Sequence, residues 1–292
     1  MERLQAAINK ARQDRGDRLT QTQARSAPKP SEDTAQNVPQ RAEQSSEVSA
    51  APVRKEADAG TWGSVAPLLA RPKLLQRHRI IAFERTTDSA PYDMLRTRIV
   101  KEMNREGYRR LMVTSPTSSC GKTTTCCNLA YSLSHQDDLK TIVIEADLRR
   151  PAIAKMLGVS SGQSFYEVLD GRADFASQAK RIGNSVLMGV NFGPARSPSE
   201  LLQSKRTAEV LNEIEAAFQP DLMIFDLPPL LANDDALGFT KNVDCALLMA
   251  MAERTTTADL DVCERDLASH TNVLGVVLNR CRYATSQYGY DY

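Results

Sequence analysis

The chain has 292 residues, 41% hydrophobic and 25% charged, with a net charge of +1, which argues against a strong general attraction to nucleic acid. No apolar run approaches the roughly 18–20 residues that would span a bilayer, and no apolar region of a secretory signal follows the first residues. We therefore expect a cytoplasmic protein with one domain of roughly 200 residues and extensions.

The first quarter of the chain is polar. Residues 1–75 are rich in Ala, Gln, Ser, Arg and Glu, and large apolar residues are sparse. Such a segment buries too little apolar surface to offset the entropy lost on ordering, so we expect a disordered extension. A short helix over residues 1–18 is an alternative for its start. The folded domain is predicted at 76–282, and residues 283–292 form a tail.

A phosphate-binding loop is the first pattern with chemical content. After an amphipathic helix predicted over Tyr92–Glu106, the apolar run Leu111–Val113 predicts a buried strand, and a helix-forming run extends to about Ser134. Strand, loop and helix in this order form a setting in which loop N–H groups and the helix N-terminus bind polyphosphate. The predicted nucleotide-binding residues are Ser115, Ser119, Cys120, Gly121, Lys122, Thr123 and Thr124.

The loop departs from the usual G-x-x-x-x-G-K-[ST] pattern. Pro116 occupies the position of the first glycine, and Gly121 is the one glycine of the loop. A Gly-Lys-Thr sequence that merely begins a helix is therefore the alternative. If a nucleotide binds, Lys122 is expected to reach its terminal phosphates, and the Thr123 hydroxyl can be a ligand of Mg²⁺.

Strands and helices alternate in the rest of the chain. The predicted strands are continuous apolar runs, which is typical of a parallel sheet covered by helices on both faces. Ligands of such folds bind at the carboxyl ends of the strands. Strands are predicted at 141–146, 186–190, 222–227, 245–251 and 273–278, and helices at 151–156, 199–202, 207–218 and 257–269.

Acidic residues stand at the ends of two predicted strands. Asp147 ends the strand in I-E-A-D-L-R-R-P, and Asp226 ends the strand in I-F-D-L-P-P. A carboxylate at such a position is costly unless it is paired or coordinates a metal, so Asp226 and Asp147 are predicted metal-binding residues. Glu145 or Asp147 is the predicted proton acceptor. The alternative is that Asp147 caps the following turn or pairs with a neighbouring arginine.

The C-terminal tail is rich in tyrosine. Half of the eight tyrosines of the chain fall within its last ten residues, although tyrosine is too apolar to be common in a tail. A Gly-containing tail could carry a tyrosine hydroxyl into the active site of a neighbouring molecule. A docking tail is the alternative. The tyrosines concerned are Tyr283, Tyr288, Tyr290 and Tyr292.

Taken together, the sequences S-P-T-S-S-C-G-K-T-T, I-E-A-D-L-R-R-P, G-P-A-R-S-P-S-E-L-L, F-D-L-P-P and V-V-L-N resemble the bacterial tyrosine kinases (BY-kinases) of capsule and exopolysaccharide systems. The resemblance covers roughly residues 92–292. It implies a P-loop NTPase-like α/β fold, with a mostly parallel sheet and helices on both faces. It also implies an ATP- and Mg²⁺-dependent tyrosine autokinase that regulates polysaccharide synthesis or export and phosphorylates its own tail tyrosines between subunits.

The same resemblance assigns further residues. The D-x-D-x-R motif of the family is occupied by Glu145, Asp147 and Arg149, so a glutamate replaces its first aspartate. Lys122, Glu145, Asp147 and Asp226 are then the catalytic residues. Asn279 matches the position expected to contact the adenine, and Arg280 lies beside it.

Two departures from the family concern assembly. The E-x-x-R-x-x-R motif of its oligomerisation helix is altered, because Ala90 and Asp93 replace the glutamate and the first arginine and only Arg96 remains. A homo-oligomer is still implied, but a ring held by those contacts is in doubt. No fused membrane segment is seen, so a separate membrane-embedded activator of the chain-length or co-polymerase type is expected to recruit the protein to the inner face of the cytoplasmic membrane. A cognate tyrosine phosphatase is a further implied partner.

Two other functions remain as alternatives. A partition or positioning ATPase would carry a signature lysine five residues before the catalytic one, where this chain has Thr117. An ATP-binding scaffold, which switches a polysaccharide assembly machine with little kinase activity, is compatible with the glutamate at position 145 and the altered oligomerisation motif.

Overall fold

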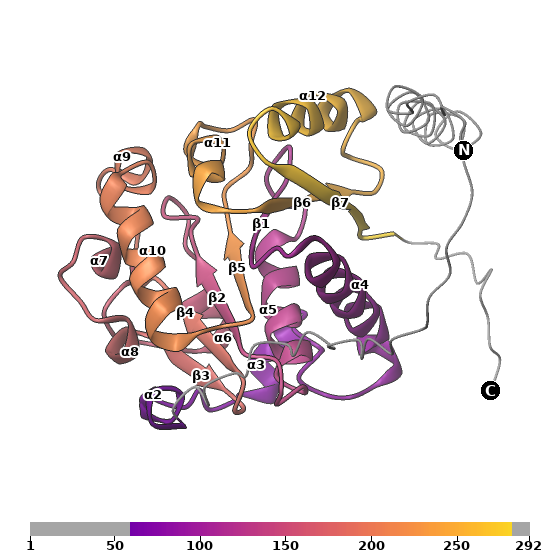
Figure 1. The fold of residues 1–292 in the computed structure, drawn as a ribbon. Coiled ribbons are helices and arrows are strands. Elements are labelled where there is room, and N and C mark those ends of the chain that lie inside the picture. The colour runs from indigo at the N-terminus through magenta and orange to yellow at the C-terminus, as the bar shows by residue number, and fades with distance from the viewer. Residues whose placement is uncertain (1–58, 282–292) are drawn as a thin grey trace, which may run out of the picture. The chain divides into compact units, whose positions relative to one another are not determined.

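The computed structural model describes residues 59–281, in which a seven-stranded sheet carries helices on both faces (Figure 1). The strand order is β3-β4-β2-β5-β1-β6-β7, and every neighbouring pair is parallel except β3 and β4. The predicted P-loop NTPase-like fold class is thereby confirmed. The strands are β1 (Arg110–Thr114), β2 (Thr141–Glu145), β3 (Lys180–Ile182), β4 (Val186–Gly189), β5 (Leu222–Asp226), β6 (Cys245–Met251) and β7 (Asn272–Asn279).

The helices mostly follow the strands, as parallel connections require. The long ones agree with the sequence prediction to within two residues, and each has an apolar face that packs on the sheet. The α-helices are α2 (Ala59–Ser64), α3 (Pro72–Arg77), α4 (Ala90–Glu106), α5 (Lys122–Leu133), α6 (Ile153–Leu157), α7 (Phe165–Leu169), α8 (Phe175–Gln178), α9 (Pro198–Leu202), α10 (Lys205–Phe218), α11 (Asp235–Phe239) and α12 (Thr257–Ala268), with 3-10 turns at Thr87–Ser89 and Thr240–Asn242.

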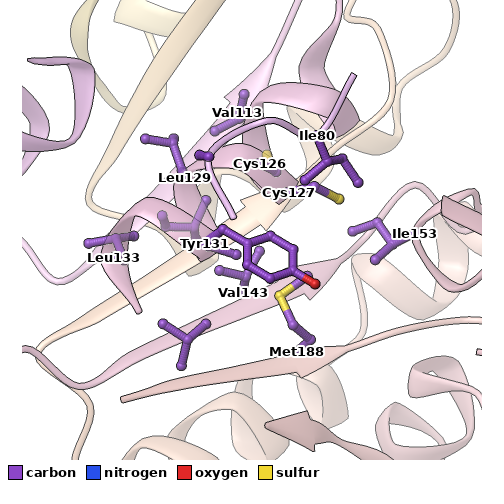
Figure 2. Close-up of a cluster of buried hydrophobic side chains, with 14 of the residues drawn as sticks. Ile80, Val113, Cys126, Cys127, Leu129, Tyr131, Leu133, Val143, Ile153 and Met188 are labelled. Atoms are coloured by element: carbon purple, nitrogen blue, oxygen red, sulfur yellow. The ribbon is translucent and has the colours of Figure 1, made fainter. Parts of the chain in front are cut away.

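Two hydrophobic cores lie on opposite faces of the sheet, because successive side chains of a strand point to opposite sides. In β1, Leu111 and Val113 belong to the core beneath α4 and α5, whereas Met112 belongs to the core beneath α10 and α12. Figure 2 shows the first core, in which Leu129 of α5 lies with Val113 and Val143 of the sheet. Both faces of the central strands are therefore buried, as continuous apolar runs predict, whereas Val276 and Leu278 of the edge strand β7 are exposed.

The predicted start of the folded domain at residue 76 is wrong. Helix α2 lies upstream of it, and its Trp62 is buried on the second core, where the ring packs edge-on against Phe218 at 6.1 Å. The Trp62 Nε1–H also donates a hydrogen bond of 2.8 Å to the Phe218 carbonyl oxygen. Val65 and Leu75 are fully buried as well, so residues 59–75 belong to the domain. The predictions for residues 1–58 and for the tail lie outside the described residues.

Helix α4 carries the altered oligomerisation motif. Its retained arginine is engaged within the chain: Arg96 Nη1 donates to Asp93 Oδ1 at 3.0 Å and to the Ser132 carbonyl oxygen of α5 at 2.8 Å. The Ser132 hydroxyl donates to the same Asp93 carboxylate. These bonds join α4 to α5. They also engage the Arg96 guanidinium within the chain, whereas the resemblance to the family implies a contact with another subunit. Within residues 59–281, no helix is long and apolar enough to cross a membrane.

Candidate nucleotide-binding site

The loop between β1 and α5 has the backbone of a phosphate-binding loop. Ser119 and Gly121 both adopt positive φ angles, of 67° and 93°, so that the chain curls back before α5 begins at Lys122. The Lys122 side chain is only 7% exposed, and its Nζ donates to Ser115 Oγ at 3.2 Å. The ammonium group is thus held over the loop, where a polyphosphate would lie.

Asn279 fixes this loop to the end of β7. Its Nδ2 donates to the Cys120 carbonyl oxygen at 2.9 Å, and its Oδ1 accepts from the Arg280 backbone N–H at 2.8 Å. A Cβ added at Gly121 would lie 2.2 Å from Asn279 Nδ2, so this amide would have to move, and the φ of 93° also favours glycine at this position. The side chain predicted to contact adenine therefore also supports the phosphate loop from the protein side.

An open cavity of about 750 Å³ extends from the loop across the carboxyl ends of β2 and β5. It brings together Ser119, Lys122 and Thr123 with Asp147, and the segment after β5 forms its other wall. Asn279 and Arg280 line a separate cavity of about 660 Å³ between α4 and β7. Of the other predicted nucleotide-binding residues, Ser115 and Cys120 are buried within the loop. Gly121 and Thr124 are partly exposed, but they do not line the first cavity.

Asp226, the last residue of β5, is a fully buried carboxylate. Neither of its oxygens accepts a well-formed hydrogen bond from the described residues. Burial raises its pKa to about 7, although the nearby Lys122 ammonium and Thr123 hydroxyl both act to lower it. A carboxylate without partners at a strand end beside a phosphate loop fits an Mg²⁺ site, because a cation would repay its desolvation.

Glu145 lies at the neighbouring strand end but is engaged elsewhere. Its Oε1 accepts backbone N–H groups of Ala152 at 2.5 Å and Ile153 at 2.7 Å, and its Oε2 accepts that of Asn191 at 2.8 Å. It is 1% exposed, and burial raises its pKa to about 7 while these bonds act against the rise. Glu145 thus organises the loops after β2 and β4, and it does not line the cavity.

Asp147, by contrast, lies on the cavity wall and is partly exposed. Its Oδ1 also accepts the Arg150 backbone N–H at 3.0 Å, so the predicted turn cap is present as well. One carboxylate oxygen caps the turn, and the group as a whole remains accessible from the cavity that Lys122 and Thr123 line.

Sequence reasoning missed the partners of Arg149. This arginine lines the cavity and forms a two-pronged ion pair with Asp235, at 2.6 Å from Nε to Oδ2 and 2.9 Å from Nη2 to Oδ1. Ser199, from the G-P-A-R-S-P-S-E-L-L segment, accepts from Arg149 Nη2 at 2.8 Å. Adjacent aspartates at 234 and 235 gave no usable signal, because only the fold shows which one is buried.

Comparisons with known proteins agree with this geometry. A sequence profile described as the CobQ/CobB/MinD/ParA nucleotide binding domain matches residues 111–289. The chain is 31% identical over 226 residues to the tyrosine-protein kinase wzc of Salmonella typhi, a match that covers 75% of this chain and 31% of that protein. The chain thus spans less than a third of that relative's length.

Two further matches cover more of the related protein. The tyrosine-protein kinase YwqD of Bacillus subtilis is 29% identical over 224 residues, which are 75% of this chain and 93% of that protein. Among solved structures, the kinase domain of the Escherichia coli tyrosine kinase ETK is 30% identical with a TM-score of 0.53, over 63% of this chain and 72% of that one.

Proposed function

Because the chain belongs to the CobQ/CobB/MinD/ParA nucleotide-binding domain family and its named relatives are tyrosine-protein kinases, we propose that it is an ATP-dependent protein-tyrosine autokinase. We further propose that it regulates exopolysaccharide or capsule synthesis or export. The names of these relatives favour a kinase over a partition ATPase. The observation that carries the proposal is the buried carboxylate of Asp226 beside Lys122 and the phosphate loop, whose oxygens accept no well-formed hydrogen bond from the described residues.

The residues divide the proposed reaction between them. Lys122 and the N–H groups of the loop hold the phosphates, and Thr123 and Asp226 are the groups that would hold Mg²⁺, which leaves Asp147 for proton transfer. When bound there, Mg²⁺ would neutralise charge on the phosphate oxygens. Asp147 takes the proton of the tyrosine hydroxyl, whose oxygen forms a bond to the γ-phosphorus. The bond from that phosphorus to the bridging oxygen breaks, and ADP leaves.

Asp147 is a better proton acceptor than Glu145 on this geometry. Glu145 already accepts three backbone N–H groups at both of its oxygens, so a tyrosine would have to displace one of them. Asp147 lies on the cavity wall with Lys122 and Thr123. The glutamate at the first position of the family motif therefore acts on loop structure in this proposal.

The tail and the partners complete the proposal. The acceptors are Tyr283, Tyr288, Tyr290 or Tyr292 of another copy of the chain, which requires an oligomer. Arg96 is occupied within its own chain, so that oligomer does not use the family's charged contacts in their usual form. A separate membrane-embedded activator and a cognate phosphatase remain the proposed partners, at the inner face of the cytoplasmic membrane.

The proposal is tested by mass spectrometry of the purified protein after incubation with Mg·ATP. We compare the parent with Lys122→Ala and with the control Lys101→Ala, which removes an exposed lysine of α4. Phosphate on tail tyrosines of the parent and the control, but not of Lys122→Ala, supports the autokinase. If the tail stays unmodified with the membrane partner present while ATP still binds, the chain is the ATP-binding scaffold instead.

A further inference from the structure

We propose that Asp235 and Ser199 are positioning residues that hold the Arg149 guanidinium against the phosphoryl group while it is transferred. The inference rests on the proposed function. It extends that function to two residues outside the phosphate loop and the acidic strand ends, from two separate helices, α11 and α9.

The three side chains form one connected network. The Asp235 carboxylate is completely buried, and both of its oxygens receive Arg149 through the bonds described above. The Ser199 hydroxyl accepts from Arg149 Nη2 and donates to Asp235 Oδ1. Arg149 is thus held along one edge of its guanidinium. The hydrogen bonds to the Asp235 carboxylate raise the pKa of this arginine, so the group stays charged.

The other edge of the guanidinium is free for a ligand. Arg149 Nη1 has no hydrogen-bond or ion-pair partner among residues 59–281, and the side chain is 42% exposed where it lines the cavity with Lys122 and Thr123. Burying a carboxylate whose charge is balanced only by a half-exposed arginine is a weak way to stabilise a fold. It is an effective way to hold a planar, always charged donor in one orientation.

A fixed guanidinium suits phosphoryl transfer for an electrostatic reason. Negative charge spreads over the oxygens of the transferring group, and donors held in place before the reaction stabilise it without reorganising. Arg149 lies in the loop that follows β2, and Asp235 lies at the end of the loop that follows β5. The network therefore joins these two loops across the cavity, with Ser199 of α9 as a third support. The competing explanation is a purely structural link between these segments.

The experiment measures both ADP formation and tail phosphotyrosine with the full chain and Mg·ATP. The variants are Asp235→Asn, Ser199→Ala, Arg149→Ala and the double variant Arg149→Ala/Asp235→Asn. ATP affinity and thermal unfolding are measured on each. The matched control is Glu213→Gln, which removes an exposed arginine–carboxylate pair with Arg206 on α10, away from the nucleotide cavity.

We expect Asp235→Asn to lower turnover about 10- to 100-fold while the Kd for ATP changes less than about 3-fold. Ser199→Ala, which keeps the ion pair, lowers turnover by a smaller factor. Asp235→Asn should cause no further loss once Arg149 is alanine, because its effect acts through the guanidinium. Glu213→Gln behaves as the parent.

Additive losses in the double variant, or full turnover in Asp235→Asn, overturn the positioning role. If Asp235→Asn does not fold, Ser199→Ala combined with Arg149→Ala gives the same comparison. A parent that forms ADP without phosphotyrosine refutes the autokinase, yet the network is still judged from ADP formation. A parent that turns over no ATP in either assay, even with the membrane partner added, refutes both.

Discussion

The buried carboxylate of Asp226 should make the stability of the ligand-free protein depend on pH. Well below pH 3.8 the group carries its proton in the folded and the unfolded chain alike. As the pH rises, the unfolded chain ionises near the ordinary pKa of 3.8, while the folded chain keeps the proton until about pH 7. The folded state then binds more protons, so the free energy of unfolding falls over this range and levels off above it.

The size of the effect follows from the displacement of the pKa. At about 1.4 kcal/mol per pKa unit, a rise from 3.8 to about 7 costs about 4 kcal/mol of stability once the group is ionised. The variant Asp226→Asn is neutral at every pH and avoids this cost. Its free energy of unfolding relative to the parent should therefore increase by up to about 4 kcal/mol between pH 4 and pH 8.

The assay is urea unfolding of the metal-free parent and variant across that pH range, with exposed Asp138→Asn as the control. A repeat with saturating Mg·ATP should stabilise the parent, by about 2.7 kcal/mol at one hundred times Kd, and leave Asp226→Asn nearly unaffected. A difference between variant and parent that stays constant from pH 4 to pH 8 would refute the reasoning, because the carboxylate would then ionise equally well in both states.

Three further predictions concern other parts of the domain. Glu145→Gln should lower the free energy of unfolding by about 1–3 kcal/mol in denaturant experiments, because the new side-chain N–H₂ group would face a backbone N–H donor. Turnover of ATP should fall far less in this variant than in Asp147→Asn. Gly121→Ala should abolish ATP binding, measured by calorimetry, because the added Cβ would collide with the Asn279 amide. An unchanged affinity for ATP would disprove the close approach. Trp62→Ala should cost about 3–5 kcal/mol in unfolding experiments with turnover retained at low temperature, and a smaller loss would mean that α2 is not part of the domain.

The central strands were predictable because they are continuous apolar runs, and their burial on both faces leaves no other solution. Strand β3 was missed, since its three residues are partly polar and are ordered by long-range contacts: antiparallel pairing with β4 and backbone hydrogen bonds between Arg181 and residues 66 and 68. Helix α2 was missed for a related reason: its six residues are mostly small, and Trp62 is buried through a contact with Phe218, a residue far away in the sequence.

The candidate site shows the same division. Lys122 and Asp226 were predictable from local patterns, because a phosphate loop and a strand-end carboxylate are defined by their neighbours in the chain. The hydrogen bonds of Glu145 were not predictable, because its carboxylate oxygens accept N–H groups from the loops after two different strands, β2 and β4. The burial of Asp235 was not predictable either, because it depends on how α9 and α11 pack near the end of β2.

The amide of Asn279 has a mechanical consequence. It bonds to the phosphate loop at the Cys120 carbonyl oxygen, and the described chain ends two residues later, at Cys281. The end of β7 is also paired with β6 through the bond from the Ala252 N–H to the Asn279 carbonyl oxygen, so Asn279 links the nucleotide loop, the sheet and the start of the tail. In the proposed autokinase, binding of a molecule's tail by another subunit and binding of a nucleotide by that same molecule would therefore be coupled.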